Sequence, residues 1–280
     1  MVTLAGADAM AKHLTAVYAI GQILWIRYVV YALYGTYTAY AGSGRAGFRS
    51  RNLALQLARG TLLVVSNIVI VFSFSRLALA DVHAVIAVAP LAVTAASVLL
   101  LGERVDRPRW IAVGVGFAGV VVIVRPGIGV FEPIALVPLA GAGLYTVYQI
   151  LTKLVTRNDG PGPTQFYTGL TGLFWFSLLA PFVWIEPAPV DWCWLIAAAI
   201  AGTAAHVMIV RGLHLAPAST LQPFNYSMLV AAALFGFFFF GEMPDRWTLA
   251  GASIVVGAGL FVMYRERRAL ATPRSGDRAA

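Results

Sequence analysis

The sequence predicts an all-α integral membrane protein with ten transmembrane helices, arranged as two inverted five-helix repeats. The first indication is composition: 60% of the 280 residues are hydrophobic and 11% are charged, whereas soluble domains carry about 25% charged residues. The second is length. Uncharged stretches of 19 and 26 residues separate Asp191 from Arg211 and Asp159 from Glu186, and about 20 apolar residues cross a bilayer core. The third is a sequence unit that occurs twice, half a chain apart.

The repeated unit runs from Leu79 to Gly127 and again from Ala216 to Arg265. Each copy has a long uncharged apolar stretch, a Gly-Glu pair, a short charged loop and a Gly-rich apolar stretch. Gly102-Glu103 in the first copy matches Gly241-Glu242 in the second, an offset of 139 residues (241 minus 102), which is half the chain. A unit that recurs once at half-length indicates two related halves.

Ten spans follow in order from the apolar stretches and from the charged or Pro- and Gly-containing segments between them. The first is the weakest, because Asp8, Lys12 and His13 lie within it. The predicted spans are Met1 to Ala19, Gln22 to Ala41, Arg59 to Leu79, Val82 to Leu101, Trp110 to Val124, Ile134 to Thr152, Thr164 to Trp184, Trp192 to Val210, Ala218 to Phe240 and Trp247 to Tyr264.

These spans divide the chain into three segments. Residues 1–126 form the first repeat, with spans one to five, and residues 127–264 form the second repeat, with spans six to ten. Residues 265–280 are a polar, basic tail that we predict to be disordered. A cleavable signal peptide is not expected, because the N-terminus has no basic region ahead of its apolar stretch.

Arginine and lysine indicate which loops face the cytoplasm, since short cytoplasmic loops carry an excess of both. With the N-terminus inside, the outer segments hold little beyond Arg125 and Arg246. Both termini are therefore predicted to be cytoplasmic, in a multi-pass protein of the inner membrane. Five spans per half turn the second half upside down, so that segment 102–109 lies inside and segment 241–246 outside. Inverted repeats are typical of secondary transporters, whose substrate site lies between the halves.

The doubled Gly-Glu unit resembles the EamA-type branch of the drug/metabolite transporter superfamily. The resemblance extends from Asp8 to Arg268 and includes Ala80-Asp81 before the fourth span, LAPAS at 215–219, and the segments LGERV and RWIAVGVGFAGVVVIVRPG. It implies a ten-helix permease with both termini cytoplasmic that moves small metabolites without ATP hydrolysis. The short N-terminal start departs from the family pattern, so whether the first helix is complete at Met1 is open.

Three further segments are similar to a subgroup that includes riboflavin and S-adenosylmethionine importers. They are DAMAKHL at 8–14, YQILTK at 148–153 and PFNYSMLV at 223–230. Amino-acid exporters share the same broad fold. The resemblance therefore implies a small-metabolite permease without fixing its substrate or its direction.

Several function classes find no support in the sequence. It contains no GxxxxGK[ST] phosphate loop, no HExxH and no GxSxG, so we expect no enzyme activity, no cofactor and no metal. The single Cys193 excludes an intrachain disulfide and a cysteine-based metal cluster. The net charge of +8 arises beside predicted spans, which favours membrane topology over nucleic-acid binding. A membrane assembly factor without transport activity is the alternative from another class.

Polar side chains inside apolar spans are candidates for substrate binding, since polar groups in a bilayer face protein or water. The sixth span carries Tyr145, Tyr148, Gln149 and Thr152 at three- and four-residue spacing, which places them on one helix face. Other spans add Asn67, Tyr167, Trp175, Gln222, Asn225 and Tyr226. The alternative is that these groups form hydrogen bonds between helices.

Ionisable residues inside spans are also candidates, because burying a charge in a bilayer is costly. Arg27, within the segment WIRY, could bind an anionic group of the substrate, or could extend towards the interface from a helix end. Asp8 and Lys12 lie one turn apart and could relay a proton, or could neutralise one another as an ion pair. His83 and His206 could couple transport to protons, or could be hydrogen-bonded packing residues.

Pro90 and Pro223 lie inside the predicted fourth and ninth spans, where each removes a backbone hydrogen bond. Interrupted helices in paired spans of two halves point towards a binding site, so we predict a kink or hinge at each proline. The glycines that follow each Gly-Glu unit are expected to let helices pack closely. They are Gly114, Gly116, Gly119, Gly251, Gly257 and Gly259.

The sequence thus predicts a secondary-active transporter with two partners, a small-molecule substrate and the lipid bilayer, and with no nucleic-acid partner. Uptake of a vitamin- or nucleoside-type metabolite is the main expectation, and export of amino acids or drugs is the alternative. The coupling ion is not fixed by any motif. Small-residue helix faces serve contacts within and between chains equally well, so a homodimer is left open.

Overall fold

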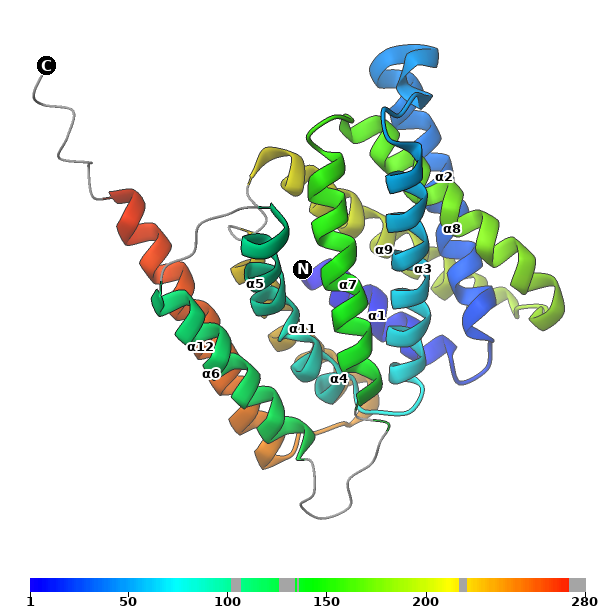
Figure 1. Ribbon diagram of the computed structural model, residues 1–280. Helices are drawn as coiled ribbons and strands as arrows, with labels where there is room; N and C mark the ends of the chain where they lie inside the picture. Colours follow the sequence, from blue (N-terminus) through cyan, green and yellow to red (C-terminus); the bar gives the residue numbers. More distant parts are fainter. Residues whose placement is uncertain (102–106, 126–133, 135, 217–220, 272–280) are drawn as a thin grey trace, which may run out of the picture.

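A computed structural model of the chain describes residues 1–101, 107–125, 134, 136–216 and 221–271. Every regular element in these ranges is helical, as the composition predicts (Figure 1). The α-helices are α1 (Val2–Leu14), α2 (Ile20–Ser43), α3 (Leu53–Phe74), α4 (Leu79–Ile86), α5 (Ala89–Leu101), α6 (Arg107–Val124), α7 (Leu136–Val155), α8 (Pro161–Val183), α9 (Pro189–Leu215), α11 (Tyr226–Phe240) and α12 (Arg246–Ala271). The 3-10 helices are η1 (Gly44–Phe48) and η3 (Gln222–Asn225).

The helices have the length and the surface that a bilayer requires. By length and composition, four stretches could cross a membrane: Leu53–Phe74, Leu79–Leu100, Pro161–Val183 and Pro189–Leu215. Shorter apolar helices cover Trp110–Val124, Tyr226–Phe240 and Arg246–Val262. Large apolar side chains point outward, and Leu99, Phe182, Leu215 and Phe238 are 73–88% exposed. Extensive exposed apolar surface is rare on soluble monomers and fits contact with lipid.

Helices that are far apart in the sequence pack side by side. α2 packs along α8, α6 along α12, α3 along α7 and α1 along α9, and Figure 1 shows the α6–α12 pair on the side of the molecule away from α2 and α8. A Cβ atom added at Gly119 would lie 2.9 Å from the carbonyl oxygen of Gly251, and one added at Gly251 would lie 2.5 Å from that of Gly119. The predicted close packing of the Gly-rich spans is confirmed at this α6–α12 contact.

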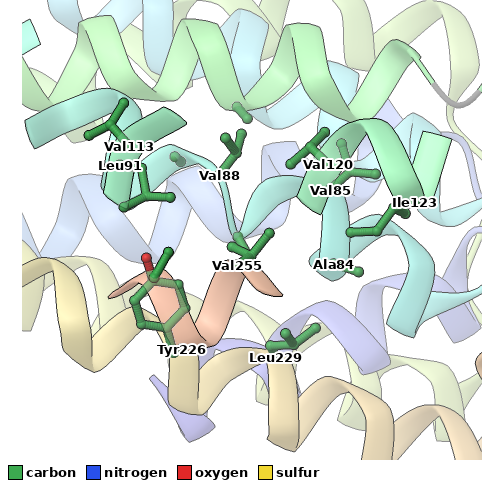
Figure 2. Packing of buried hydrophobic residues seen from close by; sticks show 14 of the residues in the cluster. Ala84, Val85, Val88, Leu91, Val113, Val120, Ile123, Tyr226, Leu229 and Val255 are labelled. Carbon is green, nitrogen blue, oxygen red and sulfur yellow. The ribbon is translucent and has the colours of Figure 1, made fainter. Parts of the chain in front are cut away.

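The two copies of the repeated unit share one hydrophobic core. Figure 2 shows Val85 of α4, Val120 of α6 and Val255 of α12 directed towards the same space as Tyr226 and Leu229 of α11. All of them are buried. The repeated unit therefore joins the two halves of the chain through apolar contacts.

The predicted fourth and ninth spans are both interrupted. α4 ends at Ile86 and α5 begins at Ala89, so Pro90 lies in the first turn of α5. The N–H groups of a first turn have no acceptor within the helix, so a proline there costs no helix hydrogen bond. In the second half, the 3-10 helix η3, which includes Pro223, precedes α11. The structure thus breaks the helix near each proline, as predicted, and the hinge role of the two prolines stays a prediction.

Several helices begin or end a few residues away from the predicted span bounds, and two of these differences change how residues near them are interpreted. α12 continues past Tyr264 to Ala271, so residues 265–271 are helical and not disordered. The reason is local. Arg, Glu, Ala and Leu favour helix, and residues 265–272 contain no Gly or Pro that would end the helix. α3 begins at Leu53 and not at Arg59, because Asn52 caps it by accepting a hydrogen bond from the backbone N–H of Leu55. Arg59 is therefore inside a helix and fully buried.

The second Gly-Glu pair ends a helix. Gly241 has a positive φ of 66°, the left-handed conformation that glycine adopts at helix C-termini. Its N–H donates to the carbonyl of Phe237, and the N–H of Glu242 donates to that of Gly236. Glu242 is thus held at the end of α11. The first pair, Gly102-Glu103, lies outside the described residues.

Candidate functional site

A cavity in the centre of the helix bundle brings together eight of the residues predicted from the sequence. They come from seven helices and from η3, and are Asp8, Arg27, Asn67, His83, Pro90, Tyr145, His206 and Asn225. The rest of the lining is mostly apolar, with Leu4, Ile70, Ile86, Met228 and Leu229 among its residues. We call this space the central cavity. Its volume of about 70 Å³ is enough for a few water molecules.

Arg27 of α2 forms one polar pair in the central cavity. Its Nη2 lies 3.0 Å from Nδ1 of His206 on α9. Arginine can only donate hydrogen bonds, so Nδ1 accepts and the neutral ring carries its proton on Nε2, which is buried and has no hydrogen-bond partner among the described residues. Gly202, one turn before His206, makes room for this contact, since a Cβ atom there would lie 2.7 Å from Nε of Arg27.

Asp8 of α1 and His83 of α4 form the second polar pair. The Oδ2 of Asp8 lies 3.5 Å from Nε2 of His83, and the two residues are 6% and 3% exposed. The alternative that Asp8 and Lys12 neutralise one another is wrong. Lys12 instead forms an ion pair with Glu242 and donates a second hydrogen bond to the carbonyl of Leu77, because its side chain extends to the end of α11 while Asp8 faces the central cavity.

Aromatic side chains support the charged groups of the central cavity. Tyr145 lines it and stacks on Tyr148, with ring centroids 5.6 Å apart. Both rings also lie against His206, at 6.3 and 6.4 Å. Asn67 donates to the hydroxyl oxygen of Tyr28 at 2.9 Å. The predicted tyrosine stripe thus supplies one cavity residue, Tyr145, and one residue behind it.

The remaining candidates lie elsewhere. Tyr148 is fully buried behind Tyr145, and Gln149 lines a second cavity of about 190 Å³ that shares Tyr145 and Asn225 with the first. Tyr167 donates to the carbonyl of Phe48, and Trp175 is exposed and donates to the hydroxyl of Thr61. Tyr226 packs in the hydrophobic core of Figure 2. The side chains of Gln222 and Pro223 lie outside the described residues, and a substrate role for all of these stays a prediction.

A second group of buried polar residues, which the sequence reading did not single out, joins α3 to α8. We call it the Arg59 cluster; it comprises Gln56, Arg59, Asp159, Thr164 and Thr168. Arg59 donates from Nε to Gln56 and from Nη2 to the carbonyl of Thr164 and the hydroxyl of Thr168. Gln56 in turn donates to Asp159 at 2.8 Å. The cluster is a chain of hydrogen bonds from a buried arginine to an acidic residue.

Asp159, in the loop between α7 and α8, is held ionised. Burial opposes its ionisation and would raise its pKa. The carboxylate accepts hydrogen bonds from the Ser50 hydroxyl, the Arg51 backbone N–H and the Gln56 amide. These bonds, with a further contribution from the charge of Arg59, outweigh burial and lower the pKa below its ordinary value. Asp159 thereby fixes the loop after η1 to the start of α8.

Three important residues were missed for identifiable reasons. Arg59 was predicted at the very start of the third span, and not within a helix, because the N-cap signal of Asn52 was not used. Glu242 was read as part of a structural turn, and its pairing with Lys12 connects residues 230 positions apart, which no local pattern indicates. Gly202 matters because of the side chain that passes it, and a spacing rule cannot show that.

The arrangement in the central cavity suits binding rather than catalysis. It offers a carboxylate, a guanidinium, two imidazoles and two amides around a small space. Among the described residues, no group of three or more His, Cys, Asp or Glu side chains could hold a metal ion. The side chains of the central cavity can therefore form charge pairs and hydrogen bonds with a polar solute.

Comparisons with known proteins agree with the predicted resemblance. Residues 133–264 match the model of the EamA-like transporter family. The S-adenosylmethionine uptake transporter of Rickettsia prowazekii is 26% identical over 183 residues, which cover 65% of this chain and 62% of that protein. The riboflavin transporter of Vibrio cholerae is 30% identical over 186 residues, covering 66% and 62%. The riboflavin transporter of Brucella anthropi is 25% identical over 229 residues, covering 80% and 81%.

The matched stretch thus spans 62% of the length of the Rickettsia and Vibrio relatives. A protein of known crystal structure has the same fold, with a TM-score of 0.72 over 95% of both chains at 17% sequence identity. At that identity the likeness shows the fold alone. The resemblance to EamA-type proteins, predicted from the doubled Gly-Glu unit, is confirmed.

Proposed function

We propose that this chain, which carries an EamA-like transporter domain over residues 133–264, is a membrane permease that moves a small metabolite by alternating access. The observation that carries the proposal is the central cavity, where charged and polar side chains from seven elements meet inside an otherwise apolar bundle. Ionisable residues at such a depth are costly and are a mark of a substrate path. The cavity has room for a few water molecules, so the helices that line it must separate to admit a metabolite.

The two halves of the protein, residues 1–126 and 127–264, are proposed to be inverted repeats. A matching pair of hydrogen bonds supports this. Lys12, near the end of the first helix of one half, donates to the carbonyl of Leu77, which lies three residues after the end of α3, at 2.8 Å. Lys153, near the end of the first helix of the other half, donates to the carbonyl of Leu213 at the end of α9, also at 2.8 Å. Equivalent contacts at equivalent places are what two copies of one fold would make.

The topology has a direct test. In a Cys193→Ala background, single cysteines at positions 105 and 244 report the side of the membrane on which each Gly-Glu turn lies. With both termini cytoplasmic, position 105 should be labelled by a membrane-impermeant thiol reagent only in inside-out vesicles, and position 244 only in right-side-out vesicles. Labelling of both from one side would contradict the inverted repeat.

The transport function is tested by flux into proteoliposomes that contain the purified protein. The relatives direct the choice of probes: S-adenosylmethionine carries an ammonium, a carboxylate and a sulfonium, and riboflavin is uncharged near neutral pH. Uptake and exchange of both compounds, measured in both directions, should identify one that moves faster than in protein-free vesicles. Folded protein that moves neither compound nor any amino acid of a labelled panel would overturn the proposal.

A further inference from the structure

An ion pair joins three separate helices at one end of the central cavity. Lys12 of α1 pairs with Glu242, which follows the glycine that ends α11. Lys12 also donates to the carbonyl of Leu77, in the segment before α4, at 2.8 Å. The second carboxylate oxygen of Glu242 accepts from the backbone N–H of Leu79, the first residue of α4, also at 2.8 Å. One ammonium and one carboxylate thus hold α1, α4 and α11 together.

This ion pair lies directly beyond the central cavity. Asp8 and His83 line the cavity and contact one another. Lys12 lies one helical turn after Asp8 on α1, and Leu79 lies one turn before His83 on α4, a distance of about 5.4 Å along each helix. Residues one turn apart share a helix face. The ion pair therefore occupies the next layer of the bundle after the cavity.

The opposite end of the central cavity is built differently. There it is followed by the second cavity, of about 190 Å³, and Tyr145 and Asn225 line both spaces. The order of residues along α1 shows that the two ends are opposite, because Thr3 lines the second cavity, Asp8 lines the central cavity and Lys12 forms the ion pair. At one end the central cavity is followed by a charged contact between three helices, and at the other by further open space.

The surroundings of the ion pair allow it to form and to break. The side chains of Lys12 and Glu242 are 12% and 23% exposed, so the pair is partly shielded from water and contributes more than a pair on the open surface. When the helices part, water at this end of the bundle can solvate both groups, so that neither is left as a buried unpaired charge. Arg59, by contrast, is fully buried and cannot be separated from its partners at so small a cost.

We propose that the ion pair of Lys12 and Glu242 is a latch that closes the central cavity at the end where α1, α4 and α11 meet, and that it breaks each time this end opens. The inference rests on the proposed transport function and goes beyond it, since it identifies the contact that controls access from one face of the membrane. With the predicted topology, this is the outer face. Removing either charge should shift the population towards the state that is open at the Glu242 end.

The test measures access to the wall of the central cavity. In a Cys193→Ala background, Ala87→Cys places a single thiol in that wall, next to the end of α4. The rate at which a membrane-impermeant thiol reagent modifies it is measured from each side, in right-side-out and in inside-out vesicles. Two variants weaken the latch: Glu242→Gln keeps the size of the side chain and removes its charge, and Lys12→Met removes the ammonium.

In each latch variant, modification from the side on which position 244 is labelled should become about ten-fold faster, which corresponds to 1.4 kcal/mol lost from the closed state. Modification from the opposite side should not become faster. Arg125→Met is the matched control, because Arg125 pairs with Asp245 between the end of α6 and the start of α12, and neither residue lines the central cavity. It should leave both rates unchanged.

Every other result in the latch variants would overturn the inference. Faster modification from both sides would show that the fold is loosened as a whole, and unchanged rates would show that the pair does not control access. Failure of both variants to fold would show that the pair stabilises the protein in every state and is not a latch.

The outcome can be told apart from failure of the proposed function, because modification of the thiol reports opening and requires no solute. Faster modification from the one side, without flux of any compound, would retain the latch as a control of access and reject transport. Flux together with wild-type modification rates in both latch variants would retain transport and reject the latch.

Discussion

The central cavity and the Arg59 cluster both bury an arginine and an aspartate inside an apolar helix bundle, yet they are built differently. In the Arg59 cluster the charges are connected by protein hydrogen bonds, from Arg59 through Gln56 to Asp159, and the guanidinium also binds two threonines. In the central cavity, Asp8 and Arg27 each contact one imidazole and face open space. Buried charge whose hydrogen bonds are made within the protein holds helices together, and buried charge beside a space is available to a solute.

The largest effect is expected from removing the guanidinium of Arg59, which tests whether the Arg59 cluster stabilises the fold. Arg59→Met should lose folded protein or destabilise it by about 3 to 5 kcal/mol, because Gln56 and the carbonyl of Thr164 lose a donor and Asp159 loses a nearby positive charge. The measurement is the melting temperature and the monodisperse fraction in detergent. Arg211→Met, at an exposed position, is the control and should melt near the wild-type temperature. An Arg59→Met protein as stable as the control would show that the cluster does not brace the fold.

The second prediction concerns the position of Arg27 and separates function from stability. In Gly202→Ala the new methyl group would lie 2.7 Å from Nε and 2.8 Å from Cζ of Arg27, so the guanidinium must leave His206. We expect flux to fall about ten-fold, the equivalent of 1.4 kcal/mol, with little change in melting temperature. Gly143→Ala is the matched control, because a Cβ atom there has no neighbour within 4 Å among the described residues. Equal flux in the two variants would show that the Arg27–His206 contact is dispensable.

The same two regions show what the sequence could and could not predict. Asp8, Arg27, His83 and His206 were found because a charged or titratable residue in an apolar stretch is conspicuous, and all four line the central cavity. Their partners were not found, since the Asp8–His83 and Arg27–His206 contacts depend on how α1 meets α4 and α2 meets α9. Arg59 was misplaced because the start of α3 depends on a single capping residue, Asn52. The helices could therefore be predicted from composition and length, and the pairing of side chains required the packing.

A smaller effect is expected from the titration of Asp159. Its folded-state pKa is lowered, so its contribution to stability is fully present above the unfolded-state value of about 3.9 and is lost as the pH falls through the folded-state value. Between about pH 5 and pH 3, wild-type protein should lose about 1 kcal/mol more stability than Asp159→Asn, which cannot titrate. Ser50→Ala, which removes one of the three hydrogen bonds to the carboxylate, should lie between them. Identical acid profiles for wild type and Asp159→Asn would exclude Asp159 from the acid response.

The smallest effect is expected from removing the hydroxyl of Tyr148, which tests how far the solute site extends from the central cavity towards the Arg59 cluster. Tyr148 is fully buried, stacks on Tyr145 and has a hydroxyl without a hydrogen-bond partner of good geometry among the described residues. Tyr148→Phe keeps the stacked ring and removes only that hydroxyl, so stability should change by less than about 0.5 kcal/mol and flux should stay at the wild-type rate. Tyr145→Phe is the informative partner, because Tyr145 lines the central cavity and its loss of a hydroxyl should reduce flux. A loss of flux in Tyr148→Phe as large as in Tyr145→Phe would mean that the Tyr148 hydroxyl reaches the solute in another state of the transport cycle, and the site would then extend from the central cavity towards Arg59.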